Sequence, residues 1–317
     1  MQAKENQVSR SAQQLIGQAR RVVVGKDPVL LWVLAAILAG GHILLEDIPG
    51  VGKTTMALAF SKIMGLSYSR VQFTPDVLPS DITGYSILEP STGKMVYQPG
   101  AVLCNLFLAD ELNRATSRTQ SALLEAMEEG QVTVDGVSHR IPHPFTVIAT
   151  QNPTGASGTQ LLPDSQMDRF MVRLRLGYPS PRDEMNMVLS RQKGNPLTDL
   201  EPLFTVEQVI ALREIVAQTY VGEPAVGYLV ELINATRRHD SILQGASPRA
   251  TLALTSMAKA IAQLRGRDYV IPGDVKEVFV TTIAHRLLLT ARAEGQGISP
   301  ESILRQILEQ VPAPKLR

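Results

Sequence analysis

Residues 29–45, VLLWVLAAILAGGHILL, form the longest apolar run of the chain, and the segment 40–42 divides it. The first part follows Asp27-Pro28, a helix-start signal, whereas the residues after the division are few and β-compatible. The run reaches the lower length limit of a membrane span, but a buried helix, a turn and a core strand explain its pattern better. We therefore expect no membrane span here.

Four further apolar runs have the length of strands, and segments with helical spacing lie between them. They are SYSRVQF, NLFLADE, FTVIATQNP and MVRLRLGYP, at residues 67–73, 105–111, 145–153 and 171–179. Strands that alternate with helices favour a parallel α/β sheet.

Two pairs of short strand-like segments interrupt this alternation. Residues 82–90 and 94–100 flank the turn signal Ser91-Thr92-Gly93, and residues 130–134 and 137–141 flank Asp135-Gly136. An Asp-Gly pair is favoured in a type I′ turn. Both pairs therefore predict β-hairpins that project from the sheet and are candidate contact surfaces.

The strand signals stop near residue 183, after the prolines of YPSPRDE. The remaining segments with helical periodicity lie at residues 206–221, 226–238, 247–267 and 272–293. We therefore predict two domains, an α/β nucleotide-binding core at 1–182 and an all-helical domain at 183–317.

Composition and charge narrow the function classes. The 317 residues are 44% hydrophobic and 19% charged, as in an ordinary globular protein. A formal net charge of +1 argues against nucleic acid as the main partner, because proteins that grip its backbone carry a basic excess. The single cysteine, Cys104, cannot form an internal disulfide, and residues 1–15 are too polar for a signal peptide. We expect a buried Cys104 and a cytoplasmic protein.

The stretch HILLEDIPGVGKTT, residues 42–55, predicts a phosphate loop between a strand and a helix. Gly50 and Gly52 allow a tight turn, Lys53 supplies a charge for the β and γ phosphates, and Thr54 offers a hydroxyl to Mg²⁺. Asp47 stands where the usual loop has its first glycine. We expect the chain to turn there nevertheless, because Asp tolerates left-handed conformations.

An apolar strand that ends in Asp-Glu supplies the second half of a nucleoside triphosphatase site. In LFLADE, Asp110 is placed to hold the metal through water, and Glu111 is placed to polarise the attacking water. One strand end thus predicts both the metal carboxylate and the general base.

These motifs, with four further blocks, resemble the AAA+ ATPases and among them the MoxR family. The blocks are GGHILLEDIPGVGKTT, VQFTPDVLPSDITG, LADELNRATSRTQSALLEAMEEGQVTVDG, ATQNP, LPDSQMDRF and GASPRA, in family order over nearly the whole chain. The resemblance implies a P-loop AAA+ core with a parallel sheet and β-hairpin inserts, followed by an all-helical lid. It also implies an ATPase with ATP and Mg²⁺ as cofactors.

The resemblance assigns further roles residue by residue. Asn152 matches the sensor 1 position, Arg169 the arginine finger that acts on a neighbour's ATP, and Arg249 sensor 2 in the lid. Arg173 and Arg175 lie close enough in sequence to compete with Arg169 for the finger role. The implied nucleotide-binding residues are Val24, Gly25, Pro49, Gly50, Val51, Gly52, Lys53, Thr54 and Thr55, and the implied metal residues are Thr54 and Asp110.

The leading function is that of a homo-oligomeric ring, expected as a hexamer, that remodels or matures a protein client or inserts a metal cofactor into it. The resemblance suggests a partner with a von Willebrand factor A domain. The alternative is the motor subunit of a metal-chelatase complex, because such motors share the hairpin insert. A DNA-acting ATPase expects a basic stripe that both hairpin segments lack, and a non-hydrolysing switch does not need Glu111, Asn152, Arg169 and Arg249 together.

Overall fold

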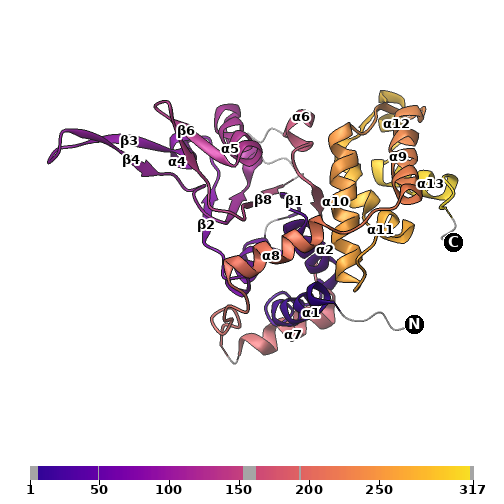
Figure 1. Cartoon of the computed structure of the whole chain (residues 1–317), viewed down its shortest axis with the longest axis horizontal. Helices are drawn as coiled ribbons and strands as arrows, with labels where there is room; N and C mark the ends of the chain where they lie inside the picture. The colour runs from indigo at the N-terminus through magenta and orange to yellow at the C-terminus, as the bar shows by residue number, and fades with distance from the viewer. Residues whose placement is uncertain (1–5, 49, 153–161, 193, 315–317) are drawn as a thin grey trace.

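The computed structural model of the chain describes residues 6–48, 50–152, 162–192 and 194–314. An α/β domain and a mostly helical domain lie side by side, and a long β-ribbon leaves the α/β domain on the side opposite the helices (Figure 1). The AAA-type arrangement expected from the sequence, a parallel sheet followed by a helical lid, is confirmed.

The central sheet has five strands in the order β2-β5-β8-β1-β9, and all neighbouring pairs are parallel. The strands are β1 (Ile43–Glu46), β2 (Tyr68–Gln72), β5 (Leu106–Asp110), β8 (Thr146–Gln151) and β9 (Val172–Leu174). Every residue of β1, β5 and β8 is buried, as expected for parallel strands covered on both faces. The carboxyl ends of the three strands therefore meet at one edge.

Helices cover both faces of this sheet. Because strand side chains alternate, Ile43 and Leu45 pack into a core with α1 (Gln7–Ala19), α2 (Asp27–Leu38) and α3 (Lys53–Ile63), whereas Leu44 faces α5 (Ser117–Glu129). Helix α2 and β1 confirm the division predicted for the long apolar run. Helix α1 was missed in the polar N-terminal stretch, although Val8, Ala12, Leu15, Ile16 and Ala19 form its buried face at helical spacing.

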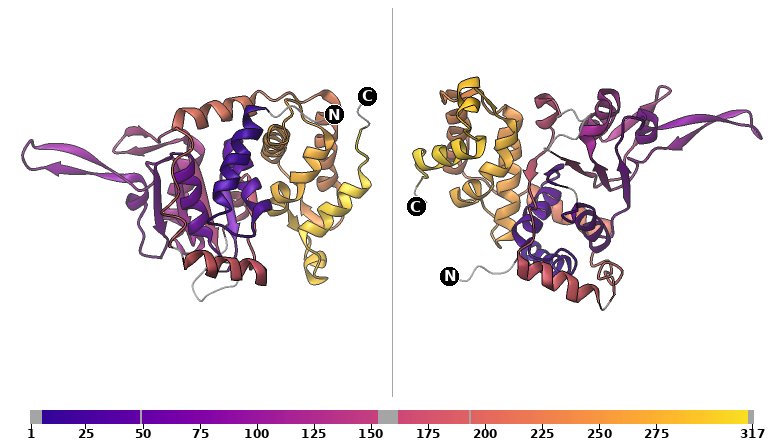
Figure 2. Two further views of the ribbon diagram at one scale, coloured as in Figure 1. Left: turned by 90° about the horizontal axis from the view of Figure 1, so that it is seen from below. Right: turned by 180° about the vertical axis from the view of Figure 1, so that it is seen from behind.

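Both predicted hairpins are present. β3 (Gly84–Glu89) pairs with β4 (Lys94–Pro99), and β6 (Gln131–Val134) pairs with β7 (Val137–Arg140). Asp135 and Gly136 have φ angles of 51° and 77°, which is the conformation that a type I′ turn requires. Both views of Figure 2 show the β3–β4 ribbon extending well beyond the body of the molecule.

The second half of the chain is helical with one exception. Its helices are α7 (Pro181–Arg191), α8 (Val206–Ala217), α9 (Glu223–Arg238), α10 (Pro248–Leu264), α11 (Pro272–Ile283), α12 (Ala291–Gly295) and α13 (Pro300–Gln310). The expectation of an all-helical domain is corrected by β10 (Ile242–Gln244) and β11 (Leu288–Leu289), an antiparallel pair too short for a period-2 signal. The boundary predicted after residue 182 falls within the first turn of α7 and stays a prediction. Among the described residues, no helix has the length and apolarity needed to span a membrane.

Two side chains next to the sheet, Cys104 and His42, have strongly shifted pKa values. Cys104 is a free, buried thiol, and burial raises its pKa to about 12, so it plays the structural part expected of it. His42 Nδ1 accepts from the Val147 N–H at 2.9 Å, and its Nε2 lies 3.1 Å from the Met127 carbonyl, to which it donates. Burial lowers the pKa of His42 to about 4.

A loss of stability in mild acid follows from His42. The unfolded chain takes up a proton near the ordinary imidazole pKa of 6.5, while the folded imidazole stays neutral to about pH 4, so stability falls as the pH drops from 6.5 toward 4. We expect His42 to contribute a loss of about 1–2 kcal/mol at pH 5 relative to pH 7. Urea unfolding at both pH values should show a smaller difference for His42→Asn, and an equal difference would contradict the assignment.

Candidate active site

The phosphate loop connects the end of β1 to the start of α3. Gly50 and Gly52 have φ angles of 85° and 96°, and no atom lies within 4 Å of where a Cβ on either would stand. Pro49 lies outside the described residues. The two glycines thus expose their backbone to open space immediately ahead of a helix N-terminus, which is the geometry that accepts phosphate.

Lys53 is the first residue of α3 and is only 8% exposed. Its Nζ donates to the Asp47 carbonyl at 2.7 Å. Burial lowers the pKa of Lys53, while the carboxylates of Asp110, Asp47 and Glu111 oppose the decrease. The ammonium therefore lies in the field of both acids that the sequence assigned to catalysis.

Asp110 ends β5 and is held from both neighbouring strands. Its Oδ2 accepts from Arg70 Nη2 on β2 at 2.8 Å, and its Oδ1 accepts from Thr150 Oγ1 on β8 at 2.7 Å. The Glu111 N–H donates to the same Thr150 hydroxyl at 2.8 Å. Sequence reasoning missed Arg70 and Thr150, because only the strand order brings them beside β5.

Glu111 starts a sharp turn and has a φ of 56°, in the left-handed region that residues with a side chain rarely adopt. Its carboxylate accepts from Arg114 Nη1 at 2.9 Å. Asn113 Nδ2, in the same turn, donates to the Asn152 carbonyl at 3.4 Å, at the end of β8. The segment that carries Glu111 thus contacts the segment of the predicted sensor 1.

Two pockets, of about 300 Å³ and about 290 Å³, separate the predicted residues into two groups. The pocket beside the phosphate loop, here called the nucleotide pocket, is lined by Val22, Val23, Val24, Lys26, Gly50, Val51, Gly52, Thr55, Tyr178, Pro179, Glu184, Met187 and Arg191. It unites the predicted Val24 with the phosphate loop. Gly25, with a φ of 73°, packs against Asp183, since a Cβ there would stand 2.3 Å from the Asp183 carboxylate.

The other pocket, here called the arginine pocket, contains both arginines that the resemblance assigned to catalysis. Arg169 Nε donates to Glu128 Oε2 at 3.0 Å, and Arg249 Nη2 pairs with Glu128 Oε1. Hydrogen bonds from Arg169 and Arg249 lower the pKa of Glu128. Arg286, unnoticed in the sequence, pairs with Asp168 at 2.8 Å in the same pocket.

The two pockets lie at opposite edges of the sheet. Gly40 and Gly41 line the arginine pocket and precede β1, whereas the phosphate loop follows β1. Met171 lines the same pocket and precedes the parallel strand β9. Four residues of strand span about 13 Å. Arg169 and Arg249 therefore lie together, away from the phosphate loop of their own chain.

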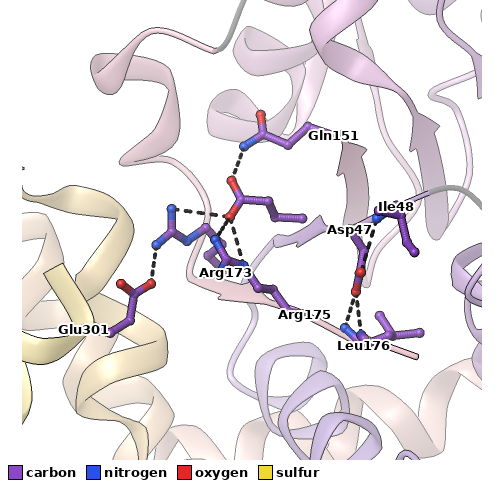
Figure 3. A network of polar contacts seen from close by, with 9 residues as sticks. Asp47, Ile48, Gln151, Arg173, Arg175, Leu176 and Glu301 are labelled. Atoms are coloured by element: carbon purple, nitrogen blue, oxygen red, sulfur yellow. Dashed lines mark hydrogen bonds and ion pairs between the residues drawn. The ribbon is translucent and has the colours of Figure 1, made fainter. Parts of the chain in front are cut away.

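Arg173 and Arg175 have other partners (Figure 3). Arg175 donates to Glu46 Oε2 at 3.1 Å through Nε and at 2.5 Å through Nη2, and Arg173 pairs with Glu301 of α13 at 2.7 Å. Although burial of Glu46 has the opposite effect, Arg173 and Arg175 lower the pKa of Glu46. Both arginines are thus engaged near the carboxyl end of their own β1.

Two protein-family models match the chain. The model of the ATPase family associated with various cellular activities (AAA) matches residues 42–172, and the AAA lid domain model matches residues 234–307. The chain is 38% identical over 310 residues to chaperone MoxR1 of Mycobacterium tuberculosis, covering 95% of this chain and 82% of the relative. It is 31% identical to protein MoxR of Methylorubrum extorquens, with 93% and 92% covered.

The chain belongs to the MoxR family of AAA+ ATPases. A further relative, the uncharacterized protein YeaC of Bacillus subtilis, is 46% identical over 307 residues, 96% of each chain. A crystal structure described as that of an ATPase from Cytophaga hutchinsonii has a TM-score of 0.90 and 37% identity, covering 97% and 96% of the two chains. The fold of that structure thus matches nearly the whole chain.

Proposed function

We propose that this MoxR-family chain hydrolyses Mg²⁺-ATP as a subunit of a homo-oligomeric ring and uses the energy to remodel a protein client. The observation that carries the proposal is the separation of the site into two halves. The phosphate loop and acidic pair lie at the carboxyl edge of the sheet, while Arg169 and Arg249 lie at the amino edge. A ring in which one subunit's amino edge faces the next subunit's carboxyl edge completes each site.

The nucleotide half fits Mg²⁺-ATP by its chemistry. Gly50, Gly52 and Lys53 receive the phosphates, and Val24 borders the same nucleotide pocket, where the base is expected. Thr54 and Asp110 offer the oxygen ligands that Mg²⁺ prefers, and the bound ion would neutralise charge on the phosphates. Glu111 then accepts the proton of the attacking water. Asn152 follows β8 at the same edge and orients that water.

The contacts of Glu128 support the role that we propose for the arginine pocket. Its carboxylate lies between Arg169 and Arg249 and is bound by both, so the two guanidinium groups already converge on one anion. We propose that a neighbour's γ-phosphate takes the place of Glu128 when the ring closes. Arg169 remains the finger of this proposal, because Arg173 and Arg175 bind Glu46 and Glu301 near the carboxyl end of their own β1, on the side of their own phosphate loop.

The β3–β4 ribbon favours a protein client over DNA. It exposes Tyr85, Ile87, Leu88, Met95 and Val96, whereas its only charged residues are Glu89 and Lys94. Apolar, nearly uncharged surface suits polypeptide and does not attract a phosphate backbone. The size of the ring, expected as six, and a partner with a von Willebrand factor A domain belong to the same proposal. A chelatase-type motor remains the alternative, since its client is also a protein.

Mixing two inactive variants tests the shared site. Arg169→Ala should bind ATP and lose turnover by about 10³-fold, because it lacks the charge that a neighbour needs. In an equal mixture with Glu111→Gln, about a quarter of the interfaces pair an intact Glu111 with an intact Arg169, so that fraction of activity should return. Phosphate release across mixing ratios measures the recovery.

Arg238→Ala is the matched control, since Arg238 lies on the surface of α9 and pairs with Glu231. It should keep full turnover alone, and in an equal mixture with Glu111→Gln about half of the sites should be active, because every intact Glu111 then faces an intact Arg169. A monomer in sedimentation that is fully active would refute the ring. So would a mixture that co-assembles and stays inactive at every ratio.

A further inference from the structure

The residue that replaces the usual first glycine of the phosphate loop, Asp47, ties that loop to the segment leading into the lid. We infer that Asp47 is a positioning residue, through which the nucleotide site and the lid domain move together. This inference rests on the proposed ATPase function. It goes beyond that function by assigning a role to a residue outside the group that receives the phosphates, Gly50, Gly52 and Lys53.

The side chain of Asp47 is directed at the chain just after β9 (Figure 3). Oδ2 accepts two consecutive backbone N–H groups, from Leu176 at 2.5 Å and Gly177 at 2.8 Å. Oδ1 accepts from the Ile48 N–H at 3.2 Å. Two N–H groups on one carboxylate oxygen form a charge-assisted clamp, and the residue is only 9% exposed.

The backbone of Asp47 has contacts of a different kind. Its carbonyl accepts from Lys53 Nζ at 2.7 Å, and its N–H donates to the Gln151 carbonyl at 3.2 Å, one residue before Asn152. Among the described residues, only Glu111 and Asp135 have a positive φ without being glycine, so Asp47 does not adopt the left-handed turn expected of it. The carboxylate, which glycine lacks, is therefore the reason for aspartate here.

The segment that Asp47 clamps leads to α7, the first helix of the second domain as predicted from the sequence. Gly177 has a φ of 63°, the next carbonyl, that of Tyr178, accepts from Lys26 Nζ at 2.7 Å, and α7 begins at Pro181. Tyr178 and Lys26 both line the nucleotide pocket. The clamp thus holds the chain where it passes from the sheet, along the nucleotide pocket, into the second domain.

A second set of contacts connects the residue before Asp47 to the lid side. Glu46, the residue before Asp47, binds Arg173 and Arg175 of the β9 segment, and Arg173 also binds Glu301 of α13. Gln151 donates to Glu46 at 3.0 Å. The last two residues before the phosphate loop are therefore both connected to the lid side, one through arginines and one through backbone amides.

These contacts provide a physical route from nucleotide to lid. The Lys53 ammonium donates to the Asp47 carbonyl and has two further N–H groups for a phosphate, so a phosphate that draws the ammonium toward itself also pulls on the Asp47 backbone. A shift of the Asp47 backbone is carried by its carboxylate to Leu176 and Gly177, since the clamp resists separation. The lid, attached beyond Gly177, then follows.

Asp47→Gly and Asp47→Asn separate positioning from binding. The glycine keeps every backbone contact with Lys53, so the Kd for ATP should stay within about threefold of the wild-type value, whereas kcat should fall about 10-fold to 100-fold. The asparagine retains an oxygen for the two amides, and its kcat should stay within about threefold of wild type. Calorimetry measures Kd, phosphate release measures kcat, and thermal unfolding checks that both variants fold.

A distance measurement adds a readout that a purely structural role would not affect. Spin labels on Arg118→Cys in α5 and Arg305→Cys in α13, both exposed, report the separation of core and lid, while Cys104 is buried. Wild type and Asp47→Asn should change this distance on adding Mg²⁺-ATP, and Asp47→Gly should not.

The outcomes distinguish the two proposals. If wild type neither binds nor hydrolyses ATP, the proposed function fails and the role of Asp47 falls with it. If wild type is active and Asp47→Gly matches its kcat and its ATP-dependent distance, only the positioning role is overturned. It is also overturned if Asp47→Gly and Asp47→Asn lose ATP affinity and thermal stability equally.

Discussion

Glu111→Gln is expected to bind Mg²⁺-ATP normally and to lose about 10²-fold to 10⁴-fold in turnover, because it removes the general base and little else. Asp110 keeps its hydrogen bonds with Arg70 and Thr150, and the Glu111 N–H still donates to Thr150. The left-handed φ of 56° is set by the turn and is unaffected by the amide. Glutamine has the same length and shape as glutamate but is not basic.

Steady-state phosphate release measures the turnover of the variant, and calorimetry measures its affinity for ATP. Glu125→Gln is the matched control, an exposed acid on α5 whose loss should leave turnover unchanged. Normal phosphate release from Glu111→Gln would contradict the base role. The variant is also the form in which to capture clients, because it should hold ATP without hydrolysing it.

Lys53→Ala is expected to weaken ATP binding by about 100-fold or more, because it removes a buried side-chain cation at the phosphate loop. Burial lowers the pKa of Lys53, so the folded protein gains little from this charge without a ligand. Among the described residues, its ammonium donates only to the Asp47 carbonyl, so the variant should still fold.

Lys62→Ala provides the comparison from the same helix. Lys62 lies nine residues along α3, and its Nζ donates to the Leu197 carbonyl at the surface, so its loss should not change ATP affinity. Calorimetry with Mg²⁺ present, together with thermal unfolding of both variants, separates binding from folding. Unchanged affinity in Lys53→Ala would remove the phosphate-loop assignment and with it the proposed function.

The sequence by itself determined the features that depend on neighbours along the chain. The order strand, glycine loop, helix around Lys53 was readable because residues 42–55 carry the strand pattern, the glycines and the helix start in one stretch. Asp135-Gly136 identified its hairpin turn for the same reason, since the positive φ angles are a local property. The separation into an α/β half and a helical half also followed from a change of period.

Only the tertiary structure decided which of these pieces meet. Arg169 and Arg249 share Glu128 although more than forty residues separate each from it, and no periodicity connects them. The strand order β2-β5-β8-β1-β9 brings Arg70 and Thr150 to Asp110, and it brings Leu176 to Asp47. Local propensities set each element, but the contacts between distant elements come from burying both faces of one sheet. The two edges of that sheet, and the residues assigned to each, exist only in the folded chain.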